Sequence, residues 1–212
     1  MSAAATERAP VLEVYRDDGP LGTAIGAALG RALSLPAIAL LLVAGLPLLV
    51  AIVLEGDGAA HWLVAAVVGW AVLVGGVASA RPLTDRLRWT APPALRAIEY
   101  AGLVWIGAVA GADTLHATFA LLAAITYHHY DTVYGLRHRG VTRPAWVRAV
   151  TGGWDGRLAI AVVLLVAGAL PAGFAVLAGL LAVLLVGETI AEWRRFRLGQ
   201  QPAYDDQEDE AD

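Results

Sequence analysis

Ionisable and aromatic side chains gather at one end of several apolar segments of this sequence, at spacings that place them on shared helix faces. Tyr127, Asp131 and Tyr134 recur at i, i+4 and i+7, on one side of a helix. His128 lies three residues before Asp131. An imidazole titrates near neutral pH, so His128 and Asp131 are the candidate catalytic pair, with His128 as general base. Adjacent helical residues face different sides, so we expect His129 to point toward another helix or the interface.

Carboxylates of three apolar segments could hold a cation. Mg²⁺ favours carboxylate oxygens together with a substrate phosphate. The candidate metal ligands are Asp131, Glu99 and Glu188, and Mg²⁺ is the metal that we expect. An aspartate that faces acyl chains costs about 3 kcal/mol on insertion scales. We therefore expect Tyr127, Asp131 and Tyr134 to face the bundle interior, toward the two glutamates.

Arginines near the same helix ends could bind phosphate, because a guanidinium forms paired, charge-assisted hydrogen bonds with it. In the run Gly152-Gly-Trp-Asp-Gly-Arg157, Gly153 would let backbone N–H groups approach an anion at a helix start. The candidate substrate-binding residues are Arg96, Tyr127, Tyr134, Arg137, Gly153 and Arg157.

Each of these residues also has a structural interpretation. Arginine at helix ends follows from membrane topology alone, and Tyr at the interface is typical of the aromatic belt. Glu99 with Arg96, and Glu188 with a neighbouring arginine, could be structural ion pairs. The density of the polar set nevertheless exceeds what topology needs, which favours a ligand site.

Composition indicates a membrane protein. The chain is 58% hydrophobic and 16% charged, with a mean hydropathy of +0.62, whereas a soluble domain carries roughly a quarter charged residues. The absence of cysteine excludes disulfides, thiol nucleophiles and thiolate metal sites. The sequence also lacks the phosphate-binding P-loop, the Gly-x-Ser-x-Gly nucleophile motif and the His-Glu-x-x-His zinc motif.

All 15 basic residues are arginines, and they fall into clusters separated by uncharged stretches. Cytoplasmic loops collect Lys and Arg, so the pattern predicts orientation as well as class. It predicts an all-α bundle of six transmembrane helices in the plasma membrane, with both termini cytoplasmic. The clusters are Arg8, Arg16 and Arg31; Arg81, Arg86, Arg88 and Arg96; Arg137, Arg139, Arg143, Arg148 and Arg157; and Arg194, Arg195 and Arg197.

A spanning helix needs about 20 apolar residues. The expected spans are 35–54, 62–80, 95–110, 115–130, one that begins near residue 155, and 174–193. Pro171-Ala-Gly173 is the expected turn between the last two. The alternative is a single long, kinked helix over 158–186.

The expected domain organisation has three parts. Residues 1–34 form a cytoplasmic segment, in which Leu21, Ile25 and Leu29 make the apolar stripe of a helix lying on the membrane surface. The alternative is an ordinary loop helix packed on the bundle. Residues 35–197 form the transmembrane domain, and the acidic stretch 198–212 is an expected disordered tail.

Four short runs resemble a known family. The family is an actinobacterial membrane domain of unknown function, often found C-terminal to a CDP-alcohol phosphotransferase domain. In many relatives one run reads Gly-Gly-His-Glu-Gly-Arg, where this chain has Trp154 and Asp155, so the carboxylate is kept and the imidazole is not. The runs are Ala80-Arg-Pro-Leu83, Arg96-Ala-Ile-Glu-Tyr100, Tyr127-His-His-Tyr-Asp-Thr-Val-Tyr134 and Gly152-Gly-Trp-Asp-Gly-Arg157.

The resemblance implies a role near membrane-embedded transfer of phosphorylated alcohols, and the arginine-rich end agrees with that. We expect a protein that binds a phosphorylated lipid or lipid-precursor head group at its cytoplasmic face. An enzyme of phospholipid or polyol-phosphate metabolism is one form of this hypothesis. The alternative is a non-catalytic membrane partner subunit of a separate CDP-alcohol phosphotransferase. Expected partners are membrane lipids and that enzyme, and not nucleic acid.

Overall fold

The protein is all-α over the part of the chain that the structure describes. The computed structural model describes residues 12–32, 34–83, 86–136 and 145–199, and these contain helices joined by short connections, without a strand. The helices are η1 (Leu12–Arg16), α1 (Pro20–Leu29), α2 (Ala37–Glu55), η2 (Gly56–Gly58), α3 (His61–Ser79), η3 (Arg88–Thr90), α4 (Ala91–Val109), α5 (Ala112–Tyr134), α6 (Ala145–Thr151), α7 (Gly153–Val166) and α8 (Leu170–Gly199).

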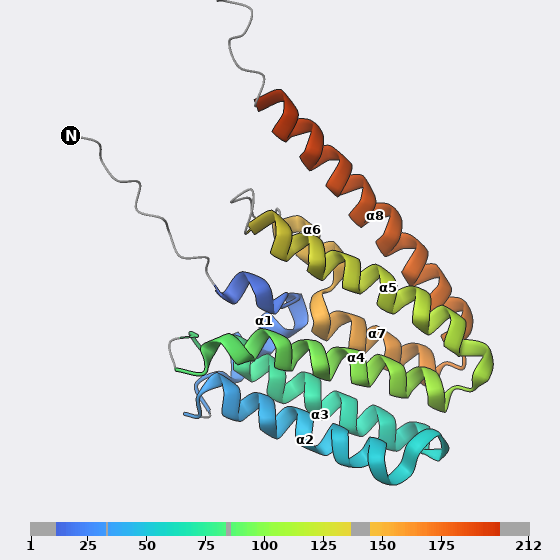
Figure 1. The fold of residues 1–212 in the computed structure, drawn as a ribbon. Helices are drawn as coiled ribbons and strands as arrows, with labels where there is room; N and C mark the ends of the chain where they lie inside the picture. Colours follow the sequence, from blue (N-terminus) through green and yellow to red (C-terminus); the bar gives the residue numbers. More distant parts are fainter. Residues whose placement is uncertain (1–11, 33, 84–85, 137–144, 200–212) are drawn as a thin grey trace, which may run out of the picture.

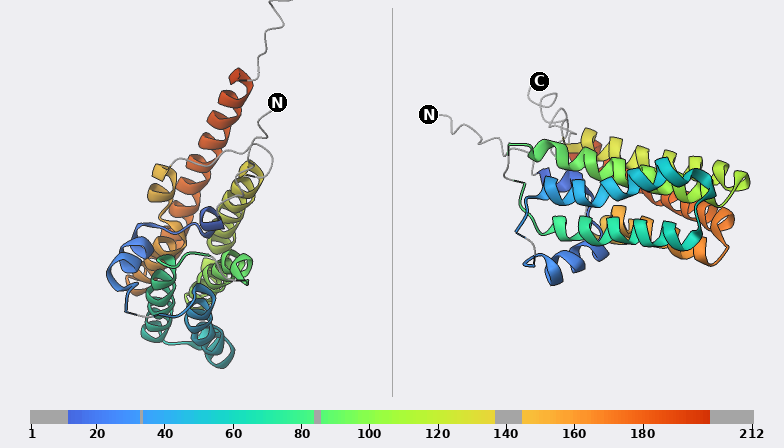
Figure 2. Two further views of the ribbon diagram at one scale, coloured as in Figure 1. Left: turned by 90° about the vertical axis from the view of Figure 1, so that its left-hand side faces the viewer. Right: turned by 90° about the horizontal axis from the view of Figure 1, so that it is seen from below.

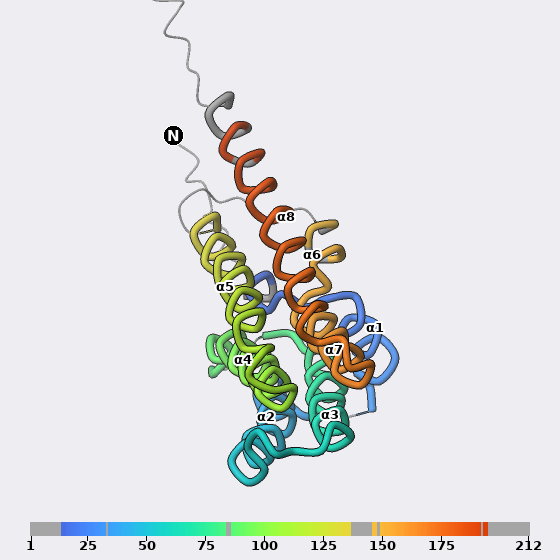
Figure 3. The backbone as a smooth tube through the Cα atoms, turned by 90° about the vertical axis from the view of Figure 1, so that its right-hand side faces the viewer, coloured from blue at the N-terminus to red at the C-terminus, as the bar shows by residue number. Residues whose placement is uncertain are grey.

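Four long helices, α2, α3, α4 and α7, run side by side and form the body of the bundle (Figure 1). The α2–α3, α4–α5 and α7–α8 connections lie together at one end, and α1 lies at the other. Helices α5 and α8 make their most extensive contacts with each other and diverge from the body as a pair (Figures 2 and 3). The end that carries α1 therefore also carries the end of α5 and the starts of α4 and α7.

Four helical segments among the described residues are long and apolar enough to cross a membrane. They are Ala37–Gly58, His61–Ser79, Ala149–Val166 and Leu170–Ala191. This agrees with a membrane protein and with the class predicted from the sequence.

The uncharged stretch 158–186 forms parts of two helices, not a single kinked one. The turn consists of residues 167–169, in which Gly168 adopts a left-handed φ of +66°. The prediction of a turn at Pro171-Ala-Gly173 is therefore wrong by a few residues. Pro171 instead occupies the first turn of α8, where its missing N–H costs nothing.

Helix α1 packs against α3 and α7 through its glycines. The leucine stripe, from which we predicted a helix on the membrane surface, does not form this contact. Gly22 and Gly26 are buried, whereas Leu21 and Leu29 are 39% and 43% exposed. A Cβ on Gly26 would lie 2.9 Å from the Gly76 carbonyl oxygen of α3. The backbones of α1 and α3 are therefore in close contact, as small residues at four-residue spacing allow in membrane helices.

Both ends of α1 are fixed by side chains distant in sequence. Asp155 accepts hydrogen bonds of 2.6 Å from the backbone N–H groups of Gly19 and Gly22. Asp155 thus accepts hydrogen bonds from the two N–H groups that side chains of the helix itself would bind in a capping box. Arg81 donates to the Gly30 carbonyl at the other end, at 2.7 Å. These bonds attach the N-terminal segment firmly to the bundle.

Candidate functional site

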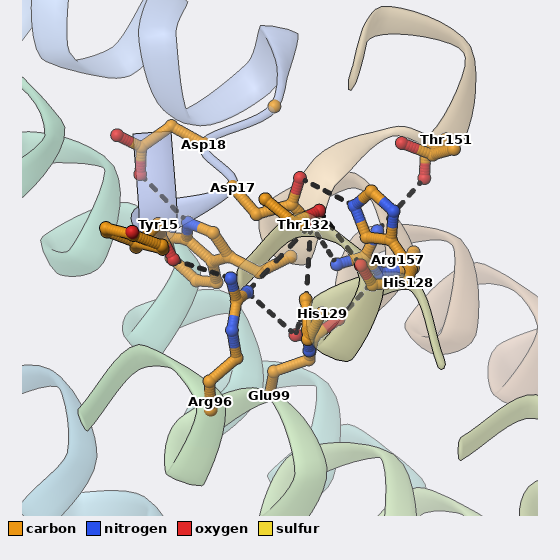
Figure 4. A network of polar contacts seen from close by, with 12 residues as sticks. Tyr15, Asp17, Asp18, Arg96, Glu99, His128, His129, Thr132, Thr151 and Arg157 are labelled. Atoms are coloured by element: carbon orange, nitrogen blue, oxygen red, sulfur yellow. Dashed lines mark hydrogen bonds and ion pairs between the residues drawn. The ribbon is translucent and has the colours of Figure 1, made fainter. Parts of the chain in front are cut away.

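A buried polar cluster lies where the η1–α1 connection meets α4, α5 and α7 (Figure 4). Asp17 is at its centre. This residue adopts a left-handed φ of 55°, a conformation that aspartate visits more readily than most residues. The backbone turns here between η1 and α1, and the Asp17 carboxylate is buried among side chains from the three longer helices.

Arg157 of α7 joins two carboxylates. Its Nε donates to Glu99 Oε1 at 2.6 Å, and one terminal nitrogen, Nη2, donates to Asp17 Oδ2 at 2.7 Å. Nη1 lies 3.4 Å from the Thr151 carbonyl oxygen. Arg157 and Glu99 are both fully buried. The guanidinium is thus used by the protein's own groups, so the structure does not support Arg157 as a phosphate ligand.

The surroundings of Asp17 favour its charged form. Burial raises the pKa of the carboxyl, but the positive charge of Arg157 and the side chains of His128 and His129 outweigh burial and hold the pKa well below its usual range. Asp17 is therefore a carboxylate at neutral pH, as a partner of a buried guanidinium should be.

Both histidines of α5 contact this carboxylate. His128 Nε2 lies 3.2 Å from Asp17 Oδ1, and His129 Nε2 lies 3.5 Å from Asp17 Oδ2. The expectation that only His128 would face the site is wrong, because Asp17 lies where both imidazoles reach it. His129 also meets the neighbouring helix, as expected: its Nδ1 lies 2.7 Å from the Tyr100 hydroxyl of α4.

Arg96 lies between this cluster and a surface groove. Its Nη2 donates to the Tyr15 carbonyl at 2.6 Å. Its Nη1 lies 3.7 Å from Glu99 Oε2 and 3.9 Å from Asp17 Oδ2, and has no hydrogen-bond partner. The groove has a volume of about 580 Å³. Its lining includes Trp89, Pro92, Arg96, His129, Tyr130 and Val133.

Asp131 belongs to a different contact, between α5 and α8. It is buried, and Thr189 Oγ1 of α8 donates to its Oδ2 at 3.3 Å. Glu188 precedes that threonine and is also buried. The group of potential metal ligands that the described residues bring within 4.8 Å of one another is Asp17, His128 and His129. The set Asp131, Glu99 and Glu188 predicted for Mg²⁺ is not such a group.

Gly153 serves packing between backbones instead of an anion site. Both Gly152 and Gly153 have left-handed φ values, +77° and +62°. A Cβ on Gly153 would overlap the backbone of Gly19 and the carbonyl oxygen of Asp17. The Trp154 N–H donates to that same oxygen at 3.2 Å. The space that an anion was expected to use is filled by the η1–α1 connection.

The remaining predicted residues lie outside the cluster. Tyr127 is 39% exposed, whereas the sequence predicted that it would face the bundle interior. Tyr134 is half-buried and stacks on Tyr130 at the end of α5. Arg137 lies outside the described residues. Arg96 thus remains the predicted phosphate ligand that lines a groove, and its buried Nη1 makes ion pairs with Glu99 and Asp17 but no hydrogen bond.

Sequence reasoning missed Asp17 and the role of His129. Asp17 contacts residues 111 and 140 positions away, and no spacing rule relates such distant residues. The signal that the sequence offers is local: Asp17 and Asp18 precede a Gly-Pro helix start.

The fold and the cluster define an all-α protein with membrane-length helices and a buried, charge-paired polar centre at one end. A family model matches residues 6–211, and its description is a family of unknown function (DUF5941). The chain belongs to this family. No curated protein and no solved structure matches the chain.

Proposed function

We propose that the protein is an integral protein of the plasma membrane that crosses it six times, with both termini on the cytoplasmic side. Helices α4 and α5 have 19 and 23 residues, enough to complete six spans with the four apolar segments. The α2–α3 connection carries Asp57, the first turn of α5 carries Asp113, and neither the α2–α3 nor the α4–α5 connection contains arginine. Arginines lie toward the opposite end, which the positive-inside rule assigns to the cytoplasm.

We propose that this protein binds a phosphate-bearing lipid, or lipid precursor, in the groove between α4 and α5. The observation that carries this proposal is Arg96, which lines an otherwise largely apolar groove and whose Nη1 makes no hydrogen bond. This nitrogen is buried beside Glu99 and Asp17, so we propose that the guanidinium turns toward the groove to donate to a phosphate. Pockets for such amphiphiles combine apolar walls with a few placed polar groups. Trp89 and Tyr130 are each 65% exposed in this region, and such aromatic rings suit the depth of lipid head groups.

The charges near the groove favour a phosphate that is held by a hydrogen bond over one that is held by a net positive charge. Formally, the guanidiniums of Arg96 and Arg157 balance the carboxylates of Asp17 and Glu99. Binding therefore depends on direct donation from Arg96 and on apolar contact with the walls, and less on net charge. Since His128 contacts Asp17 inside the cluster, we propose binding, and not acid–base catalysis, as the role of this end.

Native mass spectrometry of the detergent-purified protein tests this proposal. The probes are a short-chain phosphatidic acid and the diacylglycerol of the same chains, which lacks the phosphate. We expect preferential binding of phosphatidic acid, and a loss of about tenfold to a hundredfold in Arg96→Gln, as for a charge-assisted hydrogen bond worth about 1.5–3 kcal/mol.

Arg88→Gln is the matched control, because Arg88 is an exposed arginine of η3, near the same end. It should bind phosphatidic acid as the wild type does. Equal binding of the two lipids by the wild type, or equal losses in the two variants, would contradict the proposal. Size-exclusion chromatography of each variant verifies that it is folded.

A further inference from the structure

Three ligand atoms of the buried cluster have the arrangement of a metal site. A carboxylate oxygen of Asp17 and one ring nitrogen from each of His128 and His129 lie within 4.8 Å of one another. All three residues are buried. Imidazole and carboxylate are the donors that zinc uses in proteins without cysteine ligands.

The separations fit a tetrahedral ion. Bonds of about 2.0–2.1 Å in a tetrahedron place neighbouring ligand atoms about 3.3 Å apart. His128 Nε2 lies 3.2 Å from Asp17 Oδ1, and His129 Nε2 lies 3.5 Å from the other oxygen, Oδ2. With one ligand atom from each residue, the three atoms lie within 4.8 Å of one another. The separation between His129 and Asp17 is too long to be a hydrogen bond, and His129 Nε2 has no hydrogen-bond partner. A shared cation would satisfy both nitrogens and the carboxylate at once.

A fourth potential ligand atom and a hydrogen bond to one of the histidines also favour a metal site. Glu99 Oε2 is fully buried, has no hydrogen-bond partner, and lies 3.9 Å from His129 Nε2. The other ring nitrogen of His129 meets the Tyr100 hydroxyl at 2.7 Å. Metal-binding histidines usually have such a partner, which fixes the ring and its tautomer.

Charge is the main objection to a cation here, because Arg96 and Arg157 are close. Arg157, however, hydrogen-bonds to Glu99 through Oε1 and to Asp17 through Oδ2, which leaves Glu99 Oε2 and Asp17 Oδ1 without a hydrogen bond from arginine, although Arg96 Nη1 lies 3.7 Å from Glu99 Oε2. His128 Nε2 lies at Asp17 Oδ1. His129 Nε2 lies near Asp17 Oδ2 and Glu99 Oε2, so a cation would share these two carboxylates with the two guanidiniums.

We propose that Asp17, His128 and His129 bind a zinc-type ion, with Glu99 Oε2 as the fourth donor. The ion joins the η1–α1 connection to α5 and α4, three elements that are distant in sequence. It is a structural ion in this account, because it fixes the N-terminal segment across the arginine-rich end. The proposal does not depend on lipid binding in the groove.

Metal loading of the detergent-purified protein tests this site, with a purification tag free of histidine. The protein is stripped with chelator, loaded with Zn²⁺, and freed of excess metal. Elemental analysis should then find about one ion per chain. Co²⁺ should give the intense visible absorption of a tetrahedral site, since that geometry follows from four N/O donors.

The variants His129→Asn and His128→Ala should lower the retained zinc at least about tenfold, because each removes a ligand. His116→Ala is the matched control, an exposed histidine on the same helix, and should retain the ion. Zinc should also raise the melting temperature of the wild type and not that of His129→Asn.

If the wild-type protein retains no zinc and shows no tetrahedral Co²⁺ spectrum, the proposed metal site is contradicted, and no variant is needed to decide this. Retention of a full ion by His129→Asn would overturn it as well. Loss of zinc in His116→Ala would place the metal elsewhere. Lipid binding by the chelator-stripped protein is measured separately, so failure of one proposal is distinguishable from failure of the other.

Discussion

Arg157 Nη2 lies 2.7 Å from Asp17 Oδ2, and this contact joins residues that are 140 positions apart. The same guanidinium binds Glu99 at 2.6 Å, so one buried side chain connects the N-terminal segment, α4 and α7. Burying such a network is costly unless every charge has a partner. The stability of this end of the bundle therefore depends on each member.

Asp17→Ala should destabilise the protein by about 3–5 kcal/mol, because it leaves the buried guanidinium of Arg157 without one of its two carboxylates. Asp17→Asn, which keeps the size and tolerates the left-handed backbone, should lose somewhat less. Thermal unfolding in detergent checks both variants. Asp57→Asn, an exposed acid of η2, should melt as the wild type does, and a wild-type melting temperature for Asp17→Ala would show that the ion pair is not structural.

Gly26→Ala should destabilise the α1–α3 contact by about 1–3 kcal/mol through overpacking. The added Cβ would lie 2.5 Å from Ser79 Oγ and 2.9 Å from the Gly76 carbonyl oxygen. Gly69→Ala in α3 is the matched control, because a Cβ there meets nothing within 4 Å. That control should be neutral or stabilising by up to about 1 kcal/mol, since alanine favours helix. Unfolding in a denaturant series compares them, and equal effects of the two substitutions would argue against close α1–α3 packing.

Asp155→Ala should cost about 1–2 kcal/mol, as the loss of a helix cap does, because Gly19 and Gly22 would lose the acceptor of their N–H groups. Hydrogen exchange should show the effect locally, as faster exchange of α1 amides than of α3 amides. Asp113→Ala, an exposed acid in the first turn of α5, should leave α1 protected. Unchanged exchange of α1 in Asp155→Ala would rule out this capping role.

The helices could be predicted from the sequence to within a few residues, and the site could be predicted only in part. Uncharged runs specify α2 and α3 because a span needs a fixed apolar length. The α7–α8 turn was misplaced because Pro171 suits a helix start as well as a turn. Glu99 and Arg157 are candidate site residues in the sequence, but their direct hydrogen bond and the bond from Arg157 to Asp17 are tertiary contacts that periodicity does not encode.

The topology can be tested directly because the natural chain has no cysteine. Single cysteines at Asp57 and Asp113 should react with a membrane-impermeant maleimide added to intact cells, since the α2–α3 connection and the start of α5 face outward in the six-span arrangement. A cysteine at Arg88 should react only after the membrane is opened. Labelling of position 57 or 113 from the cytoplasmic side alone would contradict six spans with cytoplasmic termini.

The most direct measurement of the central claim is photo-cross-linking with a phosphatidic acid that carries a photoreactive group near its phosphate. The groove proposal predicts that cross-linked peptides come from the Trp89–Arg96 and Thr126–Val133 segments, whose residues line it. It also predicts that excess unlabelled phosphatidic acid suppresses the reaction, whereas diacylglycerol does not. Cross-links spread evenly over the lipid-facing helices, or unaffected by phosphatidic acid, would contradict a phosphate-binding groove between α4 and α5.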